Sequence, residues 1–360
     1  MPQKSTLQDV ADIAGVHRST VSLALRDHPR ISQELRRRIQ SIAKRLDYSI
    51  NPLVSALMQS RRLSKPTKDI SLAYVTTHST RYGWRPPHHD RPDFFPGASE
   101  RAKDFGYKME DFWLAEPGMS SRRLADILTT RNIHGLLVGR LPPEKHSIWL
   151  PWDRFSCVAV GMTLSEPALH HIAENYFDGA WQSMNQCLTR GYQRIGFVFS
   201  EANDSPHVGE RWLSAYFGQQ FRLPRKDRLP VCPGVPANKR GFIKWLTKYR
   251  PDALLCTHAR PVWEWLQNLQ VGVPGEVGIV DLAGDHPELN CAGVYNDPAV
   301  IGRTAVELLI GMLHRNEYGV PEVSQEVLMK GEWREGMTLP PKIGTGAPYA
   351  QVESQPPSSD

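Results

Sequence analysis

The sequence lacks any apolar run long enough to cross a membrane, and its first residues, MPQKSTLQD, lack the apolar core of a secretion signal. We therefore expect a cytoplasmic protein without a membrane partner. Cysteine is also scarce, since only five occur in 360 residues, widely spaced and without a Cys-x-x-Cys pair. This pattern predicts reduced core thiols rather than a disulfide framework.

Sequence signatures of catalysis are missing as well. The chain has no Gly-x-Ser-x-Gly elbow, no phosphate-binding loop, no dinucleotide fingerprint and no carboxylate pair that stands out as acid and base. Two short groups could suggest a metal site, but adjacent residues rarely complete one and no second cluster has ligand spacing. These groups are His88, His89 and Asp90, and His170 with His171. We expect no catalytic residue, no metal and no cofactor.

Acidic residues are few in the first part of the chain. Residues 1–68 hold 13 Lys and Arg against 5 Asp and Glu, a net charge of +8, whereas residues 69–360 hold 30 against 33, a net charge of −3. A basic head on a slightly acidic body is typical of a nucleic-acid-binding module attached to another domain. A solvated basic surface is the alternative, and the run of Arg36, Arg37 and Arg38 fits it.

Residues 6–25, TLQDVADIAGVHRSTVSLAL, predict two short helices joined by a tight turn. Thr6 and Asp9 have the spacing of a capping box, and the apolar residues that follow recur every three or four positions. Gly15 can adopt the left-handed backbone of a turn. The second helix has an apolar inward face, formed by Val21, Ala24 and Leu25. Its outward face carries side chains that a DNA major groove accepts, namely Arg18, Ser19, Ser22 and Leu23.

Two further helices are predicted after a polar loop. Ser32 can cap a helix that runs to about residue 46, whose apolar stripe would close a small three-helix headpiece. The stripe consists of Leu35, Ile39, Ile42, Ala43 and Leu46. Asn51 and Pro52 then begin a short apolar helix through Met58, which is too apolar to be stable alone and needs a partner.

The headpiece and the short helix that follows it resemble the DNA-binding head and hinge helix of the LacI/GalR family of bacterial repressors. In that family two hinge helices pair on the operator, and each inserts a leucine into the minor groove at the centre of a palindrome. Leu57 falls on that leucine by position, and an apolar wedge is a known minor-groove device.

The resemblance also implies individual DNA contacts. The base-reading positions fall on Arg18 and Ser19, with Leu23 one turn later, where the family often has a polar residue and a thymine methyl is the alternative target. The supporting positions, mostly facing phosphates, are Gln8, His17, Thr20, Ser22, Arg26 and Arg30. Thr6 and Asn51 complete the expected set of DNA-binding residues. For a single hydroxyl such as that of Thr20 or Ser22, helix capping or solvation is an equally good interpretation.

Beyond a basic linker, strand-like and helix-like runs alternate over the rest of the chain. The predicted strands are 70–77, 107–114, 134–138, 155–160, 195–199, 253–257 and 277–282. The predicted helices are 97–105, 122–131, 180–190, 208–221, 238–249, 261–269 and 299–315. Such alternation predicts parallel sheets flanked by helices, and the length predicts two of them.

This second part resembles the effector domain of the same family, which is related to periplasmic sugar-binding proteins. The similarity is clear at FFPGASERAKDFGY, HGLLV, GAWQSMNQCLTRGYQRIGFV and VPGEVGIV. The expected fold is thus an all-α helix-turn-helix headpiece with a hinge helix, followed by an α/β periplasmic-binding-protein-like domain of two doubly wound parallel-sheet subdomains. The expected domains are 1–49, the headpiece; 50–69, the hinge helix and linker; 70–339, the effector and dimerisation domain, split near 172 and 296; and 340–360, a disordered tail rich in Pro, Gly and Ser.

A ligand cleft is expected at the carboxyl ends of the strands. By position the effector contacts fall on His78, Ser79, Phe95, Arg211 and His258. Arg211 stands where the family has an effector-gripping arginine, although a surface or interdomain salt bridge is the alternative.

Two departures from the family put a conventional monosaccharide mode in doubt. His258 and Ala259 replace a common Asn-Asp pair, and Ala283 replaces an aspartate, which removes acceptors for sugar hydroxyls. The long aromatic segment HSTRYGWRPPHHDRP, residues 78–92, is either a lid over the cleft or a plain surface loop.

The sequence therefore predicts a homodimeric, sequence-specific DNA-binding regulator. It would repress carbohydrate-related genes from a double-stranded palindromic operator and respond to a small ligand, a sugar or a sugar derivative. Whether that ligand is an inducer or a co-repressor stays open. Two rivals are a periplasmic-type sugar-binding protein without a DNA role and an enzyme acting on a sugar-like ligand.

Overall fold

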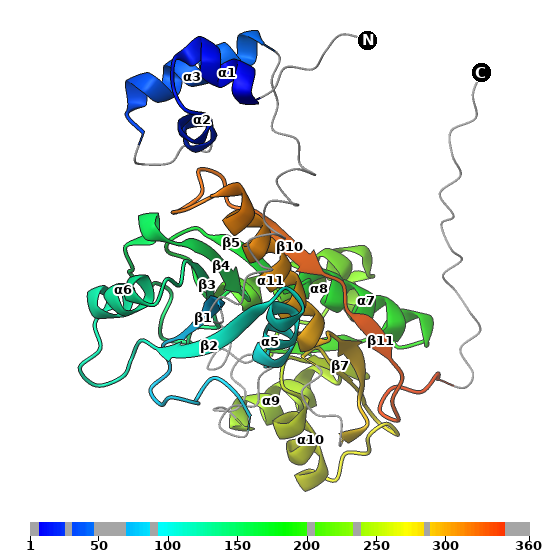
Figure 1. Cartoon of the computed structure of the whole chain (residues 1–360). Helices are drawn as coiled ribbons and strands as arrows, with labels where there is room; N and C mark the ends of the chain where they lie inside the picture. Colours follow the sequence, from blue (N-terminus) through cyan, green and yellow to red (C-terminus); the bar gives the residue numbers. More distant parts are fainter. Residues whose placement is uncertain are drawn as a thin grey trace, which may run out of the picture. The chain divides into compact units, whose positions relative to one another are not determined.

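A computed structural model describes residues 7–25, 31–46, 70–86, 93–199, 206–232, 239–283 and 289–342. The chain divides into two compact units, Met1–Ile70 with Gly311–Glu317 and Ser71–Ile310 with Tyr318–Asp360 (Figure 1). We call residues 7–46 the headpiece and the second unit the body. None of the helices in these described stretches is long and apolar enough to span a membrane.

The headpiece contains three helices: α1 (Leu7–Ala14), α2 (Arg18–Ala24) and α3 (Gln33–Arg45). Gly15 ends the first helix with φ +64°, a conformation that costs glycine nothing. Ser32 caps α3, because its hydroxyl accepts a hydrogen bond from the amide of Leu35 at 3.4 Å. All three helices contribute to one apolar core, which consists of Val10, Ala11, Ala14, Val21, Ala24, Ile39, Ile42 and Ala43. The predicted three-helix head, its turn and its cap are confirmed.

The first sheet of the body has the strand order β10-β5-β4-β3-β1-β2. Its strands are β1 (Ile70–Thr76), β2 (Tyr107–Trp113), β3 (Gly135–Val138), β4 (Ser156–Val160), β5 (His170–Glu174) and β10 (Glu326–Met329). The pairs β1 with β3, β3 with β4, β4 with β5 and β5 with β10 are parallel. The sheet is flanked by α5 (Phe95–Asp104), α6 (Ser121–Thr130) and α11 (Pro298–Arg315), with a short 3-10 turn, η1 (Trp152–Arg154), before β4. We call this layer the first subdomain.

The second sheet has the order β11-β9-β8-β7-β6. It consists of β6 (Ile195–Val198), β7 (Ala253–Cys256), β8 (Gly278–Asp281), β9 (Ala292–Tyr295) and β11 (Glu332–Arg334). The flanking helices are α7 (Tyr176–Thr189), α8 (Pro206–Arg222), α9 (Lys239–Tyr249) and α10 (Ala259–Asn268), with η2 (Arg225–Asp227) after α8. Separate apolar clusters pack α7 and α8 on one face and α9 and α10 on the other. This second subdomain is therefore doubly wound, as predicted.

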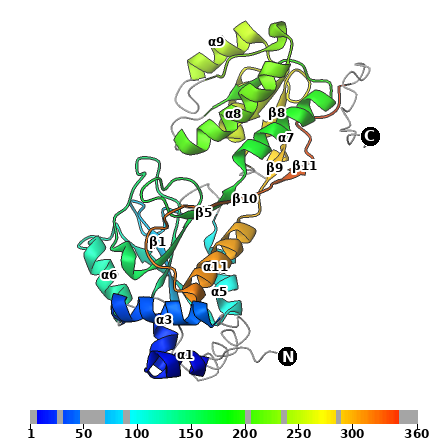
Figure 2. The ribbon, with the colours of Figure 1, turned by 90° about the horizontal axis from the view of Figure 1, so that it is seen from above.

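The chain passes between the two sheets three times, as Figure 2 shows. β5 leads into α7, β9 leads into α11, and β10 leads into β11. Two of these passages lie near the positions expected from the sequence. The third was not anticipated, because the short strands β10 and β11 were not predicted.

Several element boundaries differ from the sequence prediction. The helix expected from residue 97 begins at Phe95, because Pro96 suits a first helical turn and Asp93 accepts the Phe95 amide at 3.0 Å. The helix expected from residue 180 begins at Tyr176, where Asn175 accepts the amide of Asp178 at 3.0 Å. Strands β5, β9, β10 and β11 were missed, and β11 is antiparallel to β9, so the second sheet is not purely parallel.

The five cysteines are free thiols, buried except for the half-buried Cys291. Burial raises the pKa of Cys232 and of Cys291 to about 12, and it also raises the pKa of Cys157 and of Cys187. The prediction of reduced core thiols is consistent with these sites.

Candidate nucleic-acid interface and ligand cleft

One side of α2 packs into the headpiece core, and the other is available to a partner. Val21 and Ala24 are fully buried, whereas Arg18 and the preceding His17 are exposed. Thr20 and Leu23 are half-buried. Because Arg18 is the first residue of α2, its guanidinium is carried at the end of the helix that enters a major groove in helix-turn-helix proteins. The geometry suits the role predicted for Arg18.

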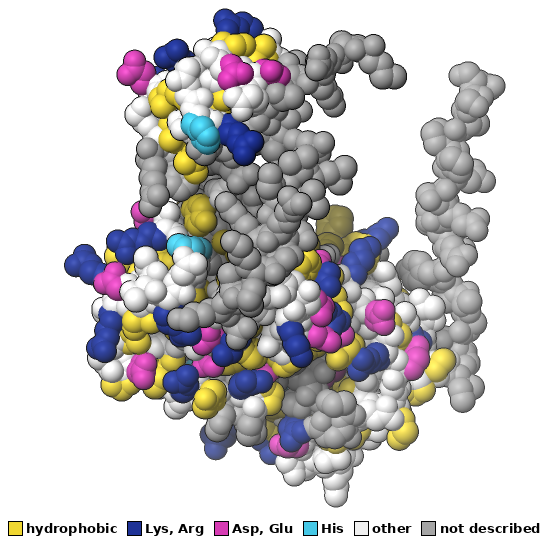
Figure 3. All heavy atoms as spheres, in the orientation of Figure 1, with side chains coloured by type: hydrophobic (Ala, Val, Ile, Leu, Met, Phe, Trp, Pro, Cys, Tyr) yellow, Lys and Arg dark blue, Asp and Glu magenta, His cyan; other side chains and the backbone are white. Residues whose placement is uncertain are grey.

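The surface of the headpiece carries basic and polar side chains. Gln8 in α1 is exposed and donates a hydrogen bond to Asp12 at 2.7 Å. Lys and Arg side chains are visible on the headpiece surface (Figure 3). On α3 the exposed cations are Arg37, Arg38, Lys44 and Arg45. Such a surface is suited to phosphate contacts, which position a protein on DNA without reading its sequence.

Part of the predicted interface lies outside the described residues. This applies to Thr6, Arg26, Arg30, Asn51 and Leu57, and therefore to the whole hinge helix. The side chains of Ser19 and Ser22 are likewise outside the description, although both residues belong to α2. These contacts stay predictions.

In the body, polar residues gather where β1 ends. Thr76, Thr77 and His78 are buried, whereas Ser79 is exposed. The Nε2 atom of His78 lies 3.1 Å from the carbonyl oxygen of Arg140, which follows β3. Burial is the main cause that lowers the pKa of His78 below the ordinary histidine value. The ring is therefore held neutral at the carboxyl edge of the sheet.

Phe95 lies in a cluster of three aromatic rings. Its centroid is 5.4 Å from that of Tyr74 on β1 and 5.5 Å from that of Trp84. Trp84 belongs to the segment predicted as a lid or a surface loop. Its side chain is buried, with 6% exposed, so the segment is anchored to the body at Trp84, whereas Arg81 and Tyr82 beside it are exposed.

A chain of hydrogen bonds between three buried or half-buried polar side chains joins the two subdomains. Arg140 donates a hydrogen bond from Nη2 to the hydroxyl of Tyr176 at 3.2 Å, and this hydroxyl donates to Glu174 at 2.6 Å. Arg140 follows β3, whereas Glu174 ends β5 and Tyr176 begins α7. Burial, and then the Glu174 carboxylate, raises the pKa of Tyr176. The phenol thus stays protonated and connects a guanidinium to a carboxylate.

Arg211 in α8 of the second subdomain pairs with Glu326 in β10 of the first. Its Nη2 atom lies 2.9 and 3.0 Å from the two carboxylate oxygens. The interdomain salt bridge, the alternative weighed for Arg211, is therefore present, while a role in gripping a ligand stays a prediction. His171 is the β5 partner of Glu326 in the sheet.

His258 occupies the N-cap position of α10 and is buried, with 5% exposed, just after β7. Asp281, which sequence reasoning overlooked, ends the next strand and is also buried. Its Oδ1 atom accepts the amide of Ala283 at 3.1 Å. A carboxylate is thus present two residues before the position where the family aspartate is missing.

Of the histidines considered as metal ligands, His170 and His171 belong to the described residues, whereas His88 and His89 lie outside them. In β5, Nδ1 of His170 accepts the amide of Gln325 at 3.0 Å, and Nδ1 of His171 lies 2.9 Å from the carbonyl oxygen of Gly161. These ring nitrogens are thus engaged with the backbone.

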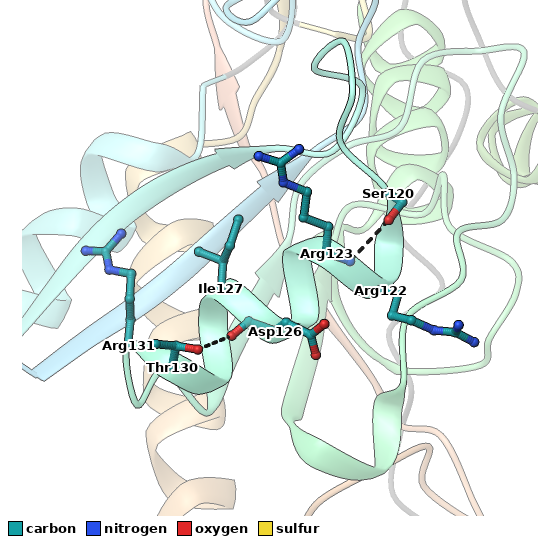
Figure 4. A pocket seen from close by; sticks show the side chains of 7 residues that line it. All are labelled: Ser120, Arg122, Arg123, Asp126, Ile127, Thr130 and Arg131. Carbon is teal, nitrogen blue, oxygen red and sulfur yellow. Dashed lines mark hydrogen bonds between the residues drawn. The ribbon is translucent and has the colours of Figure 1, made fainter.

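A separate surface pocket lies over α6, as Figure 4 shows. Its lining consists of Ser120, Arg122, Arg123, Asp126, Ile127, Thr130 and Arg131. None of the predicted effector residues contributes to it. The predicted residues lie elsewhere and are divided between the subdomains: His78 and Phe95 belong to the first, and Arg211 and His258 to the second.

Sequence reasoning also missed Arg140, Glu174 and Tyr176. All three lie at or within two residues of the carboxyl end of a strand, which is the signal that could have found them. Arg140 comes two residues after the predicted strand HGLLV, but Glu174 ends a strand that was not predicted.

Comparisons with known proteins agree over most of the chain. The model of the family described as "Bacterial regulatory proteins, lacI family" matches residues 6–51, and that of the "Periplasmic binding protein-like domain" matches residues 184–338. The HTH-type transcriptional regulator GalR of Salmonella typhimurium is 26% identical over 292 residues, which cover 77% of this chain and 79% of that protein. The NTD biosynthesis operon regulator NtdR of Bacillus subtilis is 26% identical over 212 residues, so the alignment covers only 56% of each chain.

Solved structures show the same fold. A complex of the transcriptional regulator CelR with cellobiose aligns with a TM-score of 0.55 at 16% identity, covering 93% of this chain and 99% of the other. The lac repressor dimer bound to operator and the anti-inducer ONPF aligns with a TM-score of 0.55 at 15% identity, covering 94% and 100%. With a matching head, a matching body and regulators of this kind among its relatives, the chain belongs to the LacI/GalR family of bacterial transcriptional regulators.

Proposed function

We propose that the protein is a cytoplasmic repressor that binds a palindromic DNA operator as a homodimer and responds to a small ligand in the cleft of its body. The observation that carries this proposal is the lacI-family match over residues 6–51, which coincides with the basic headpiece and with an exposed Arg18 at the start of α2. The homodimer is supported by the lac repressor, whose structure on its operator is a dimer.

Within the headpiece the proposed roles divide between bases and phosphates. Arg18 and Ser19 read base edges, because an arginine fork matches the O6 and N7 atoms of guanine. Leu23 contacts a thymine methyl, and the supporting positions mostly hold phosphates and fix the register. The paired hinge helices, with Leu57 as a wedge, would bend the operator at its centre.

For the ligand, a sugar or sugar derivative is the proposed class. Its support is that solved relatives include a regulator bound to cellobiose and one bound to glucose. His78, Ser79, Phe95, Arg211 and His258 are the proposed contacts. We infer no catalytic step, because a repressor needs only a difference in ligand affinity between its DNA-competent and incompetent states.

DNA binding is tested directly with fragments from the neighbourhood of the protein's own gene. At low salt we expect one fragment to bind well above the rest, with affinity that falls steeply as salt rises because Lys and Arg release counterions. A protein that binds a sugar but no such fragment would instead be a ligand-binding protein without a DNA role.

Ligand binding is tested by a thermal-shift screen of sugars and sugar acids. We expect a ligand that stabilises the wild type and loses its effect in Arg211→Ala. Arg222→Ala, at the end of the same helix, is the matched control and should keep the shift. Equal shifts in all three proteins would remove Arg211 from the site.

A further inference from the structure

We propose that Trp84 acts as an internal ligand: its indole packs against Tyr74 and Phe95 near the carboxyl end of β1, the edge of the sheet at which a ligand ring is expected to bind. The contacts that a bound ring would make there are then supplied by the chain itself. This inference rests on the proposed ligand-responsive function and names a device within the same site.

The first support is the packing of the indole. Its centroid lies 5.1 Å from the ring of Tyr74 and 5.5 Å from that of Phe95, and these two rings are 5.4 Å apart. Its Nε1 atom donates to the carbonyl oxygen of Arg81 at 2.9 Å. Both the apolar faces and the polar atom of the indole are therefore satisfied, which is what a buried ligand ring requires.

The second support is a clamp that holds the indole in place. The guanidinium of Arg85 lies 4.9 Å from the Trp84 ring and 5.4 Å from the Phe95 ring. It also pairs with Asp93 at 2.9 Å, and Asp93 accepts the first amide of α5. The turn that carries Trp84 is thus fixed to the start of α5 by charge as well as by stacking.

The third support is position. In open α/β sheets ligands bind outside the carboxyl ends of the strands, and Tyr74 lies two residues before the end of β1. Its ring presses on Gly139, since a Cβ added there would lie only 2.7 Å from a ring carbon. The next residue, Arg140, donates to Tyr176 of the second subdomain.

The cluster also contacts a second passage between the subdomains. Phe95 begins α5, which lies beside α11 in both ribbon views (Figures 1 and 2). The two helices touch through backbone, because a Cβ added to Gly302 would lie 2.1 Å from the carbonyl oxygen of Phe94. α11 follows β9 of the second sheet. Occupancy of the Trp84 position can therefore act on two of the three passages between the subdomains, the one from β5 to α7 and the one from β9 to α11.

The alternative is that Trp84 is an ordinary core anchor with local effect. Trp84→Gly separates the two possibilities, because free indole fits the cavity it leaves. We expect the variant to lose about 6 to 20 °C in Tm and to regain most of it in millimolar indole, with no indole effect on the wild type. Trp84→Phe, which keeps a ring, covers the case in which the glycine variant does not fold. Tyr82→Ala is the matched control, because Tyr82 is exposed on the same turn.

Two readouts then decide the proposal. In hydrogen exchange, amides at the start of α7 and in β9, on the second-subdomain side of these two passages, should exchange at least fivefold faster in the variant, and indole should reverse this. Indole should also change the operator affinity of Trp84→Gly at least fivefold while leaving that of the wild type unchanged.

Exchange changes confined to β1, α5 and the turn between them would overturn the proposal, and so would a stabilised variant whose operator affinity ignores indole. If the wild type binds no operator, the proposed repressor function is wrong. The exchange experiment does not depend on DNA, so it would still decide whether Trp84 acts across the subdomains.

Discussion

At the scale of single residues, Arg18 should affect the affinity for DNA, whereas the buried histidines should affect the stability of the folded protein. Arg18 is exposed, so it contributes binding free energy only when DNA is present. His78 and His171 are buried and bear on the folded state itself.

For Arg18 we expect loss of base discrimination. Arg18→Ala should cost about 1 to 3 kcal/mol in operator binding and relax the preference at one base pair, because a bidentate contact is removed. Arg30→Ala, predicted to face phosphate, should weaken all sequences alike. Binding to a set of single-base operator variants measures both, and a uniform loss from Arg18→Ala would refute its reading role.

For His171 we expect a pH-dependent contribution to stability. Burial lowers its pKa below the ordinary histidine value, so folding favours the neutral ring. The stabilisation is complete above the unfolded pKa and is lost as pH falls through the lowered folded value. The Tm of the wild type should therefore drop between about pH 7.5 and pH 5.5, and His171→Gln should flatten this drop. A drop that His171→Gln leaves as steep as in the wild type would contradict this assignment.

At the scale of elements, the long periodic helices and the buried strands were predictable, whereas the short edge elements were not. β5, with the sequence HHIAE, has no apolar alternation, and its burial comes from β4 and β10 on either side. β10 and β11 are only four and three residues long and partly exposed, so their apolar residues form no periodic pattern that predicts a strand. The headpiece was predicted fully because its contacts are local.

The site was predictable only in outline for a related reason. His78 and Arg211 could be placed by position, but their partners, Arg140 and Glu326, are 62 and 115 residues away. The burial of Trp84 likewise depends on Tyr74 and Phe95, which no local pattern connects to it. Long-range contacts of this kind follow from the completed topology rather than from spacing.

The contact between α5 and α11 gives a prediction at this scale. Gly302→Ala should destabilise the body by about 1 to 3 kcal/mol, because the added methyl meets the Phe94 backbone and outweighs any gain in helix propensity. Gly275→Ala is the control, since nothing lies within 4 Å of its added Cβ. Denaturant unfolding of the two variants measures the difference, and equal midpoints would show that the helices can move apart freely.

At the scale of the whole molecule, the positive net charge lies in the part of the chain proposed to bind DNA, and the slightly negative net charge in the part proposed to bind the ligand. Residues 1–68 carry a net charge of +8 and the remainder −3, so DNA affinity should reside in the head. A chain that begins at residue 70 should keep the Tm and the ligand response of the body and should bind no DNA at any salt concentration. Residual salt-sensitive DNA binding by this truncated chain would place part of the interface in the body.

The buried cysteines offer a last consequence. Protonated thiols without solvent access react with an alkylating reagent only when the surrounding structure opens. Cys157 lies in β4 of the first subdomain, whereas Cys187 lies in α7 and Cys256 in β7 of the second. The alkylation rate of each thiol, followed by mass spectrometry, therefore reports how often the structure around it opens. Equal rates would show that the two subdomains open together, and different rates that they open independently.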